Sequence, residues 1–206
     1  DLERAAWQTM LARGLNAPWC CSVGRLFDAM ASLIGLRHKM QFESQAAMEL
    51  EFALEGIVTD AVYEWLIAAR QLPMQLDWAG MIESILRDVA HGVPVGEISA
   101  KFHNTLAEVM VNVARHSGVP RVALSGGCFQ NRYLVERAVT RLREAGFQPY
   151  WHQRVPTNDG GLALGQIVAA RRAAHATDAA DAKVLPTHRT PFWPLRPSRA
   201  EGELCV

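Results

Sequence analysis

The chain has 206 residues, half of them hydrophobic, and its 21 acidic residues balance its 21 basic ones. Such a chain can bury a core in one or two domains. The balanced charge gives no support for a nucleic-acid surface, and no apolar stretch reaches the roughly 18 residues of a membrane span. We therefore expect no nucleic-acid or membrane partner and a cytoplasmic location.

Hydrophobic periodicity predicts a mostly helical chain with two short strands. The expected helices lie at 2–13, 22–35, 44–55, 59–70, 78–91, 95–117, 129–145 and 161–174. The expected strands lie at 121–125 and 147–151, and each is followed by a loop that leads into a helix. Residues 1–174 are expected to form the domain, and the Pro- and Arg-rich segment 175–206 a poorly ordered tail.

On the helix expected at 95–117, His103 and Asn104 lie close to the apolar stripe. The main interpretation is a histidine satisfied by its neighbours at the edge of the core, and a ligand role is the alternative.

The segment 122–132 places a short apolar strand directly before a glycine-rich turn, from which a helix starts. Gly126 and Gly127 permit backbone angles and a close ligand approach that a Cβ would forbid. The unpaired amide groups of the following helix point back toward this turn. This layout is typical of a nucleotide site, and it also occurs in α/β proteins that bind nothing there.

A second loop, at 155–161, follows the second strand and also leads into a helix. Ligands of open α/β sheets bind beyond the carboxyl ends of the strands, where both loops should converge. Asp159 is the carboxylate available at that edge. The residues alone allow two interpretations of Asp159, a helix cap or a ligand.

The turn at 125–132 and the loop at 156–161 resemble the C-terminal part of the Kae1-like domain of HypF-type carbamoyltransferases. Further blocks of the same family occur earlier in the chain and in the family's order, at 16–18, 22–29, 42–51 and 101–104. Together with the two loops they extend the resemblance over about residues 1–172. It implies a helix-rich α/β fold, the second lobe of an actin-like ATPase (ASKHA, Kae1-like) fold, with the first lobe absent.

The resemblance also implies an activity. ATP and carbamoyl phosphate would yield a carbamoyl-adenylate, and the carbamoyl group would pass to the C-terminal cysteine of a HypE-type protein in hydrogenase maturation. Asn131 would bind the adenylate, with Gly126 and Gly127 permitting its approach, and Asp28 would bind the ribose. Ser44 stands at a nucleotide-facing position that is usually glycine in the family.

Two of these residues have structural alternatives. Asp28 could pair with Arg25 one helical turn earlier, as an exposed ion pair. Ser44 could instead cap the helix that follows it.

In the family, Asp159 would be one ligand of a divalent metal, which could be iron, zinc or magnesium. Two histidines four residues apart complete that site, and no two of the seven histidines here have this spacing. The remaining ligands are therefore expected on the missing lobe.

No catalytic residue is assigned. No Cys-x-x-Cys spacing indicates a zinc site, so Cys20 and Cys21 are expected to be buried small residues.

Three functions remain open for the chain. The first is the nucleotide-binding lobe of a HypF-type carbamoyltransferase, inactive until it is joined to its missing lobe. The second is a tRNA threonylcarbamoyl transferase-like domain, which shares the fold and both loops. The third is a degenerate, non-catalytic fragment that is kept as an interaction module or has no function.

Overall fold

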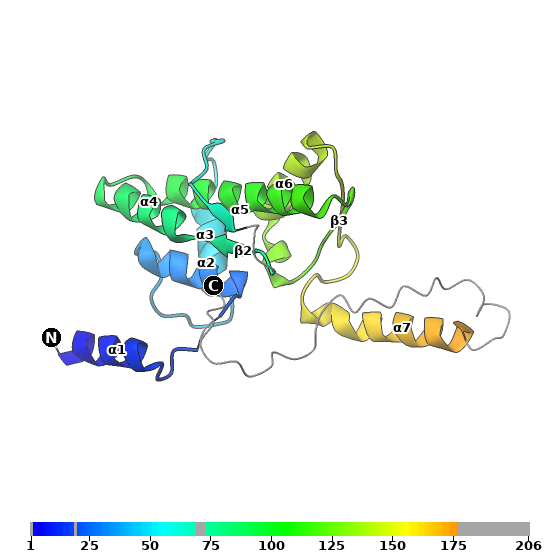
Figure 1. Ribbon diagram of the computed structural model, residues 1–206, viewed down its shortest axis with the longest axis horizontal. Coiled ribbons are helices and arrows are strands. Elements are labelled where there is room, and N and C mark those ends of the chain that lie inside the picture. Colours follow the sequence, from blue (N-terminus) through cyan, green and yellow to red (C-terminus); the bar gives the residue numbers. More distant parts are fainter. Residues whose placement is uncertain (1, 19, 69–72, 177–206) are drawn as a thin grey trace. The chain divides into compact units, whose positions relative to one another are not determined.

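The computed structural model describes residues 2–18, 20–68 and 73–176 (Figure 1). The α-helices are α1 (Leu2–Arg13), α2 (Val23–Leu33), α3 (Gln45–Ala53), α4 (Ala79–Ala90), α5 (Val95–Ser117), α6 (Arg132–Glu144) and α7 (Leu162–Ala176). The strands and 3-10 turns are β1 (Leu66–Ala68), β2 (Gln75–Asp77), β3 (Arg121–Leu124), η1 (Gly127–Gln130), β4 (Gln148–Trp151) and η2 (Asp159–Gly161). The chain is thus a helix-rich α/β protein, as predicted. Helix α7 runs to Ala176, two residues into the tail predicted at 175–206, and the rest of that tail lies outside the described residues.

The chain divides into two compact units, and the boundary between Thr105 and Leu106 falls within α5. In the first unit, α2 and α3 pack side by side (Figure 1). Ser22 caps α2, because its side chain accepts a hydrogen bond from the Arg25 amide. The core of this unit contains large side chains at the helical spacing of α2, α3, α4 and α5, namely Phe27, Met30, Leu50, Met81, Ile85, Ile98 and Phe102.

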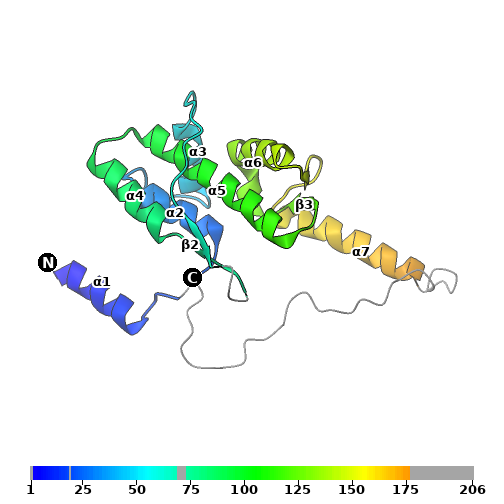
Figure 2. The same ribbon diagram turned by 45° about the horizontal axis from the view of Figure 1, so that its top comes forward.

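The first unit also contains an antiparallel ribbon of β1 and β2 (Figure 2). In its register, Ile67 lies opposite Leu76. The helix predicted at 59–70 is wrong, because residues 59–65 have no regular secondary structure and lead into β1. The side chain of Asn104 donates to the carbonyls of Thr59 and Ala61 at 2.8 and 3.2 Å. The Tyr63 amide donates to the Thr105 hydroxyl at 2.8 Å. Side chains of α5 therefore bond backbone groups of residues 59–63, which in a helix would bond one another.

The second unit is built on a parallel pair of strands, β3 and β4, whose last paired residues are Leu124 and Trp151. Helix α6 packs against this pair (Figure 1). Its apolar residues join the C-terminal half of α5 in a core of Ala107, Val111, Ala114, Leu124, Ala138, Val139 and Leu142. Both strands predicted from the sequence are confirmed within one residue at each end.

Candidate functional site

The glycine turn follows β3 at the carboxyl edge of the parallel pair. Gly126 has φ 110° and ψ 164°, a conformation that L side chains rarely adopt. A Cβ built on Gly126 or Gly127 would meet no atom within 4 Å. The backbone of this turn therefore presents an open face, as a site for a bound nucleotide requires.

The helix predicted from residue 129 begins later, at Arg132, because the 3-10 turn η1 comes first. Cys128 lies in this turn and is half-buried. Burial raises the pKa of its thiol, so the group stays protonated at neutral pH and is not an activated nucleophile.

Asn131 ends this turn and is 8% exposed. Its side-chain oxygen accepts a hydrogen bond from the Leu134 amide at 2.8 Å and so caps α6. This capping role was not predicted from the sequence, although asparagine is among the preferred N-cap residues. The cap fixes the Asn131 side chain where the glycine turn meets α6.

The second loop places Asp159 at the start of η2, where its side chain is exposed. The cap interpretation of Asp159 is wrong, because Asn158 takes that role by accepting a hydrogen bond from the Gly160 amide at 3.1 Å. A Cβ on Gly161 would lie 2.6 Å from the Pro156 carbonyl oxygen, so this loop turns too tightly for any other residue. The Asp159 carboxylate remains available for a ligand.

The structure brings the two loops together. The Gly126 amide donates to the Thr157 carbonyl at 3.0 Å, and the Thr157 hydroxyl donates back to the Gly126 carbonyl at 3.1 Å. The convergence expected from the order of strands and loops is therefore present. The glycine turn, Asn131 and the Asp159 loop form one continuous edge of the second unit.

The other two predicted nucleotide residues, Asp28 and Ser44, belong to the first unit. Asp28 lies on α2, half-buried and next to the core residue Phe27. Within the described residues its carboxylate forms no ion pair with Arg25 and no hydrogen bond, contrary to the structural alternative. It is therefore free to accept hydroxyl groups.

Ser44 precedes α3 with φ 64° and ψ 9°, in the left-handed region. Its side chain makes no capping hydrogen bond, so the cap alternative for this residue is wrong. Capping needs an extended backbone at this position, and Ser44 does not have one. The backbone keeps a conformation that suits glycine, although the residue is serine.

We expect Ser44→Gly to stabilise the chain by about 1 kcal/mol, because glycine has no Cβ to oppose the left-handed conformation and no cap is lost. Ser44→Ala is the matched control and should not stabilise, since alanine keeps the Cβ. Urea unfolding followed by circular dichroism measures both. Equal stability of the glycine and alanine variants would contradict the interpretation.

His103 is fully buried on α5, with its ring 5.3 Å from the Phe27 ring and 5.7 Å from the Phe102 ring. Its Nδ1 donates to the Ser99 carbonyl at 2.7 Å. Burial lowers the pKa of His103 to about 4, although the hydrogen bond to Ser99 opposes this shift. The histidine is therefore a neutral core residue at physiological pH, and the main interpretation of it is correct.

The described residues contain no cluster of three His, Cys, Asp or Glu side chains that could hold a metal ion. Asp159 fits one position of such a site, as an exposed carboxylate that is not used in capping.

Cys20 and Cys21 are exposed, contrary to expectation, because they lie in the loop before the cap of α2. There the Cys20 sulfur accepts a hydrogen bond from the Ser22 amide at 3.3 Å.

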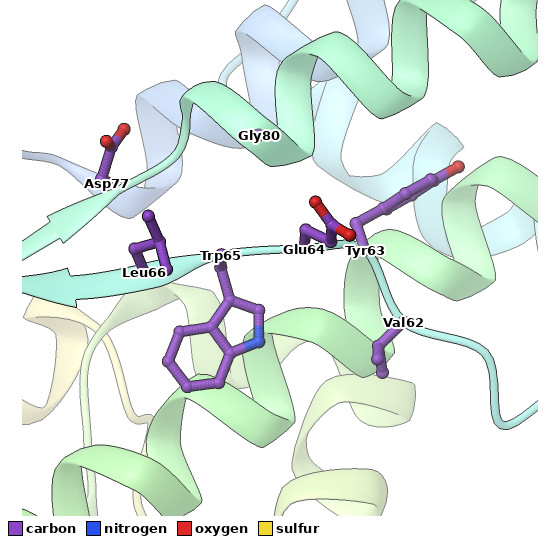
Figure 3. A pocket seen from close by; sticks show the side chains of 7 residues that line it. All are labelled: Val62, Tyr63, Glu64, Trp65, Leu66, Asp77 and Gly80. Atoms are coloured by element: carbon purple, nitrogen blue, oxygen red, sulfur yellow. The ribbon is translucent and has the colours of Figure 1, made fainter.

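A cavity of about 410 Å³ lies in the first unit, beside β1 and the start of α4 (Figure 3). Its lining consists of Val62, Tyr63, Glu64, Trp65, Leu66, Asp77 and Gly80 and includes none of the predicted site residues. The charged residues of this lining are two carboxylates, which would repel phosphate groups. The cavity therefore does not suit a nucleotide.

Comparison with known proteins identifies the family. Residues 1–166 match the family of the carbamoyltransferase Kae1-like domain, second subdomain, and the chain belongs to this family. Carbamoyltransferase HypF of Synechocystis sp. is 38% identical over 169 residues, which cover 82% of this chain and 22% of the relative. A HypF homolog of Cupriavidus necator is 37% identical, covering 79% of this chain and 44% of the relative.

Two solved structures share the fold. A full-length HypF in the phosphate- and nucleotide-bound form has a TM-score of 0.76 and 37% identity, over 84% of this chain and 23% of that one. The HypF of T. kodakarensis has a TM-score of 0.70 and 26% identity, over 85% of this chain and 23% of that one. The chain thus spans about a fifth of the length of most of these relatives.

The family match favours the carbamoyltransferase interpretation among the three that the sequence left open. Within the described part of the chain, no helix is both long and apolar enough to cross a membrane.

Proposed function

We propose that this chain supplies the nucleotide-binding part of a cytoplasmic carbamoyltransferase. The enzyme would form carbamoyl-adenylate from ATP and carbamoyl phosphate, and would pass the carbamoyl group to the C-terminal cysteine of a HypE-type protein in hydrogenase maturation. The observation that carries the proposal is the joining of two loops through Gly126 and Thr157 at the carboxyl edge of β3 and β4. A related HypF with phosphate and nucleotide bound supports it.

In this proposal each site residue has a role that suits its chemistry. The open backbone at Gly126 and Gly127 lets the adenylate approach closely. Asn131 hydrogen-bonds the adenylate from the end of this turn. Asp28 accepts the two ribose hydroxyls, and Ser44 lies against the nucleotide with a glycine-like backbone.

Asp159 would hold one position on a divalent metal, and the remaining ligands would lie in other parts of the enzyme. When bound, such an ion counters phosphate charge and polarises the carbamoyl carbonyl. The chain by itself is expected to bind nucleotide weakly and to be inactive, because the relatives extend well beyond the matched segment.

Nucleotide binding by the chain tests the proposal. ATP and adenosine should bind with similar weak affinity in calorimetric titrations. Asn131→Asp should weaken both by about tenfold, because an acidic residue still caps α6 but no longer offers an amide donor. Its melting temperature should stay close to that of the unaltered chain, which separates lost binding from lost folding.

Asn131→Ala is the companion variant, since it removes both the cap and the amide. It should lose about 1 kcal/mol of stability together with nucleotide binding. Tight ATP binding that is independent of residue 131 would show that the nucleotide lies elsewhere.

Asp159→Asn tests the metal position, in a chimaera in which this chain replaces the matched segment of the Synechocystis relative. The variant should lose bound metal and at least about a hundredfold of carbamoyl-adenylate formation, because a neutral amide is a poor ligand. Metal content is read by elemental analysis and folding by thermal unfolding. Unchanged metal and full activity would remove Asp159 from the metal site.

The matched control for this experiment is Asn158→Asp. It keeps a cap for η2, since aspartate also accepts from the Gly160 amide, and it leaves Asp159 in place. This control should retain metal and activity.

A further inference from the structure

Two residues outside the predicted site join the same two loops. Leu124 and Trp151 are the last paired residues of β3 and β4, and Ser125 and His152 follow them at the same edge. The Ser125 hydroxyl lies 3.0 Å from Nε2 of His152, within hydrogen-bond distance. The bond therefore bridges the start of the glycine turn and the start of the loop that carries Asp159.

This bond adds to the two that join Gly126 and Thr157. All three are exposed to solvent or nearly so, and a single exposed hydrogen bond contributes little because water competes for both partners. Three bonds between the same two loops are more effective together than singly. Each bond reduces the conformational freedom of the loops, so less conformational entropy is lost when the other two form.

The histidine bond is suited to this purpose in either proton arrangement. A neutral Nε2 accepts from the serine hydroxyl, and a protonated Nε2 donates to the serine oxygen. Within the described residues, neither side chain makes another hydrogen bond or ion pair. Both side chains are exposed, so packing does not require them.

We propose that Ser125 and His152 form a latch that holds the glycine turn and the Asp159 loop in the alignment that binds the nucleotide. His152 is then a positioning residue, which acts through Ser125 and the backbone of Gly126. This inference rests on the proposed function for its role in binding. The latch itself is a property of the unliganded chain and can be measured without any nucleotide.

The direct test is hydrogen exchange of the Gly126 amide by NMR in the full 206-residue chain. His152→Ala and Ser125→Ala should each speed this exchange by roughly tenfold, because the bond from Gly126 to Thr157 opens more often once the latch is lost. His152→Gln should restore slow exchange, because its side-chain amide can still bond the serine hydroxyl.

His116→Ala is the matched control. His116 is an exposed histidine of the same unit, and its Nδ1 bonds the Asn112 carbonyl of its own helix at 2.9 Å. Its loss should leave Gly126 exchange unchanged. Unchanged exchange in His152→Ala as well would overturn the latch.

The second arm measures ATP affinity by calorimetry. His152→Ala should weaken ATP binding by roughly three- to tenfold, and His152→Gln should rescue it. The double variant of Ser125 and His152 should bind no more weakly than either single variant, because both remove one bond. A merely structural role would instead lower the melting temperature without this pattern.

The two arms separate the latch from the proposed function. If the unaltered chain binds no ATP, the proposed function fails and the positioning role falls with it, while exchange still decides whether the latch exists. If the chain binds ATP and the alanine variants bind it equally well, the loops are latched but do not position the nucleotide. That result would overturn the inference.

Discussion

Lowering the pH from 7 to 4 should cost the folded chain roughly 3 kcal/mol through His103 alone. Burial lowers the pKa of this histidine to about 4 in the folded state, whereas an unfolded chain takes up the proton near pH 6.5. The unfolded state therefore binds more protons between these values. The contribution of neutral His103 to the free energy of unfolding is fully present above pH 6.5, and it is lost as the pH falls from 6.5 toward 4.

Urea unfolding at a series of pH values measures this loss, and His103→Gln is the variant that isolates it. Glutamine cannot titrate, so the slope between pH 6.5 and 4.5 should flatten even if the variant is less stable at pH 7. An unaltered slope in the glutamine variant would assign the acid sensitivity to other groups.

Two carboxylates, Glu49 and Asp88, also make stability depend on pH, but they do so at a lower pH than His103. The hydrogen bond from Arg37 lowers the pKa of Glu49. Although burial raises the pKa of Asp88, hydrogen bonds from Tyr63 and Lys101 lower it on balance. Their contribution is present above the ordinary carboxyl pKa near 4 and is lost only below it.

Gly96→Ala should destabilise the chain by about 3 kcal/mol or more. Gly96 is the second residue of α5, and a Cβ there would lie 2.3 Å from the Ala53 carbonyl oxygen and 3.2 Å from the Ile57 side chain. The Ala53 oxygen belongs to the backbone at the end of α3, so it cannot rotate away. Thermal and urea unfolding should both show the loss.

Gly80→Ala is a close control for this substitution. Gly80 is the second residue of α4, and its nearest neighbour to a new Cβ would be the Glu64 carbonyl at an ordinary 3.6 Å. This variant should be neutral or slightly stabilising, because alanine is the better helix former. Similar losses of stability at both positions would show that glycine is needed as the second residue of a helix, and that the contact with Ala53 is not the reason.

The two strands illustrate what local pattern can predict. The apolar runs before Ser125 and His152 and the turn residues after them predicted β3 and β4 within one residue. The order of strands and loops then predicted that the glycine turn and the Asp159 loop meet at one edge. Both features depend on neighbours in the sequence and on a general rule of parallel sheets.

The capping residues show where local pattern was insufficient. Both Asn158 and Asp159 are good N-cap residues, and only the folded backbone assigns the cap to Asn158. Asn131 was considered as a ligand residue, and the structure adds that its oxygen caps α6. Several side chains compete for one helix end, and the loop geometry decides among them.

The long helices, the parallel strands, the two loops and the family could all be predicted from the residues, because periodicity, glycine turns and ordered motifs are local features. That residues 59–65 form no helix depends on the packed fold, since their partners Asn104 and Thr105 lie more than 40 positions away. The same holds for the bonds from Gly126 to Thr157 and from Ser125 to His152, across 31 and 27 positions. Local propensity cannot encode such contacts, because they form only when the strands and helices have packed.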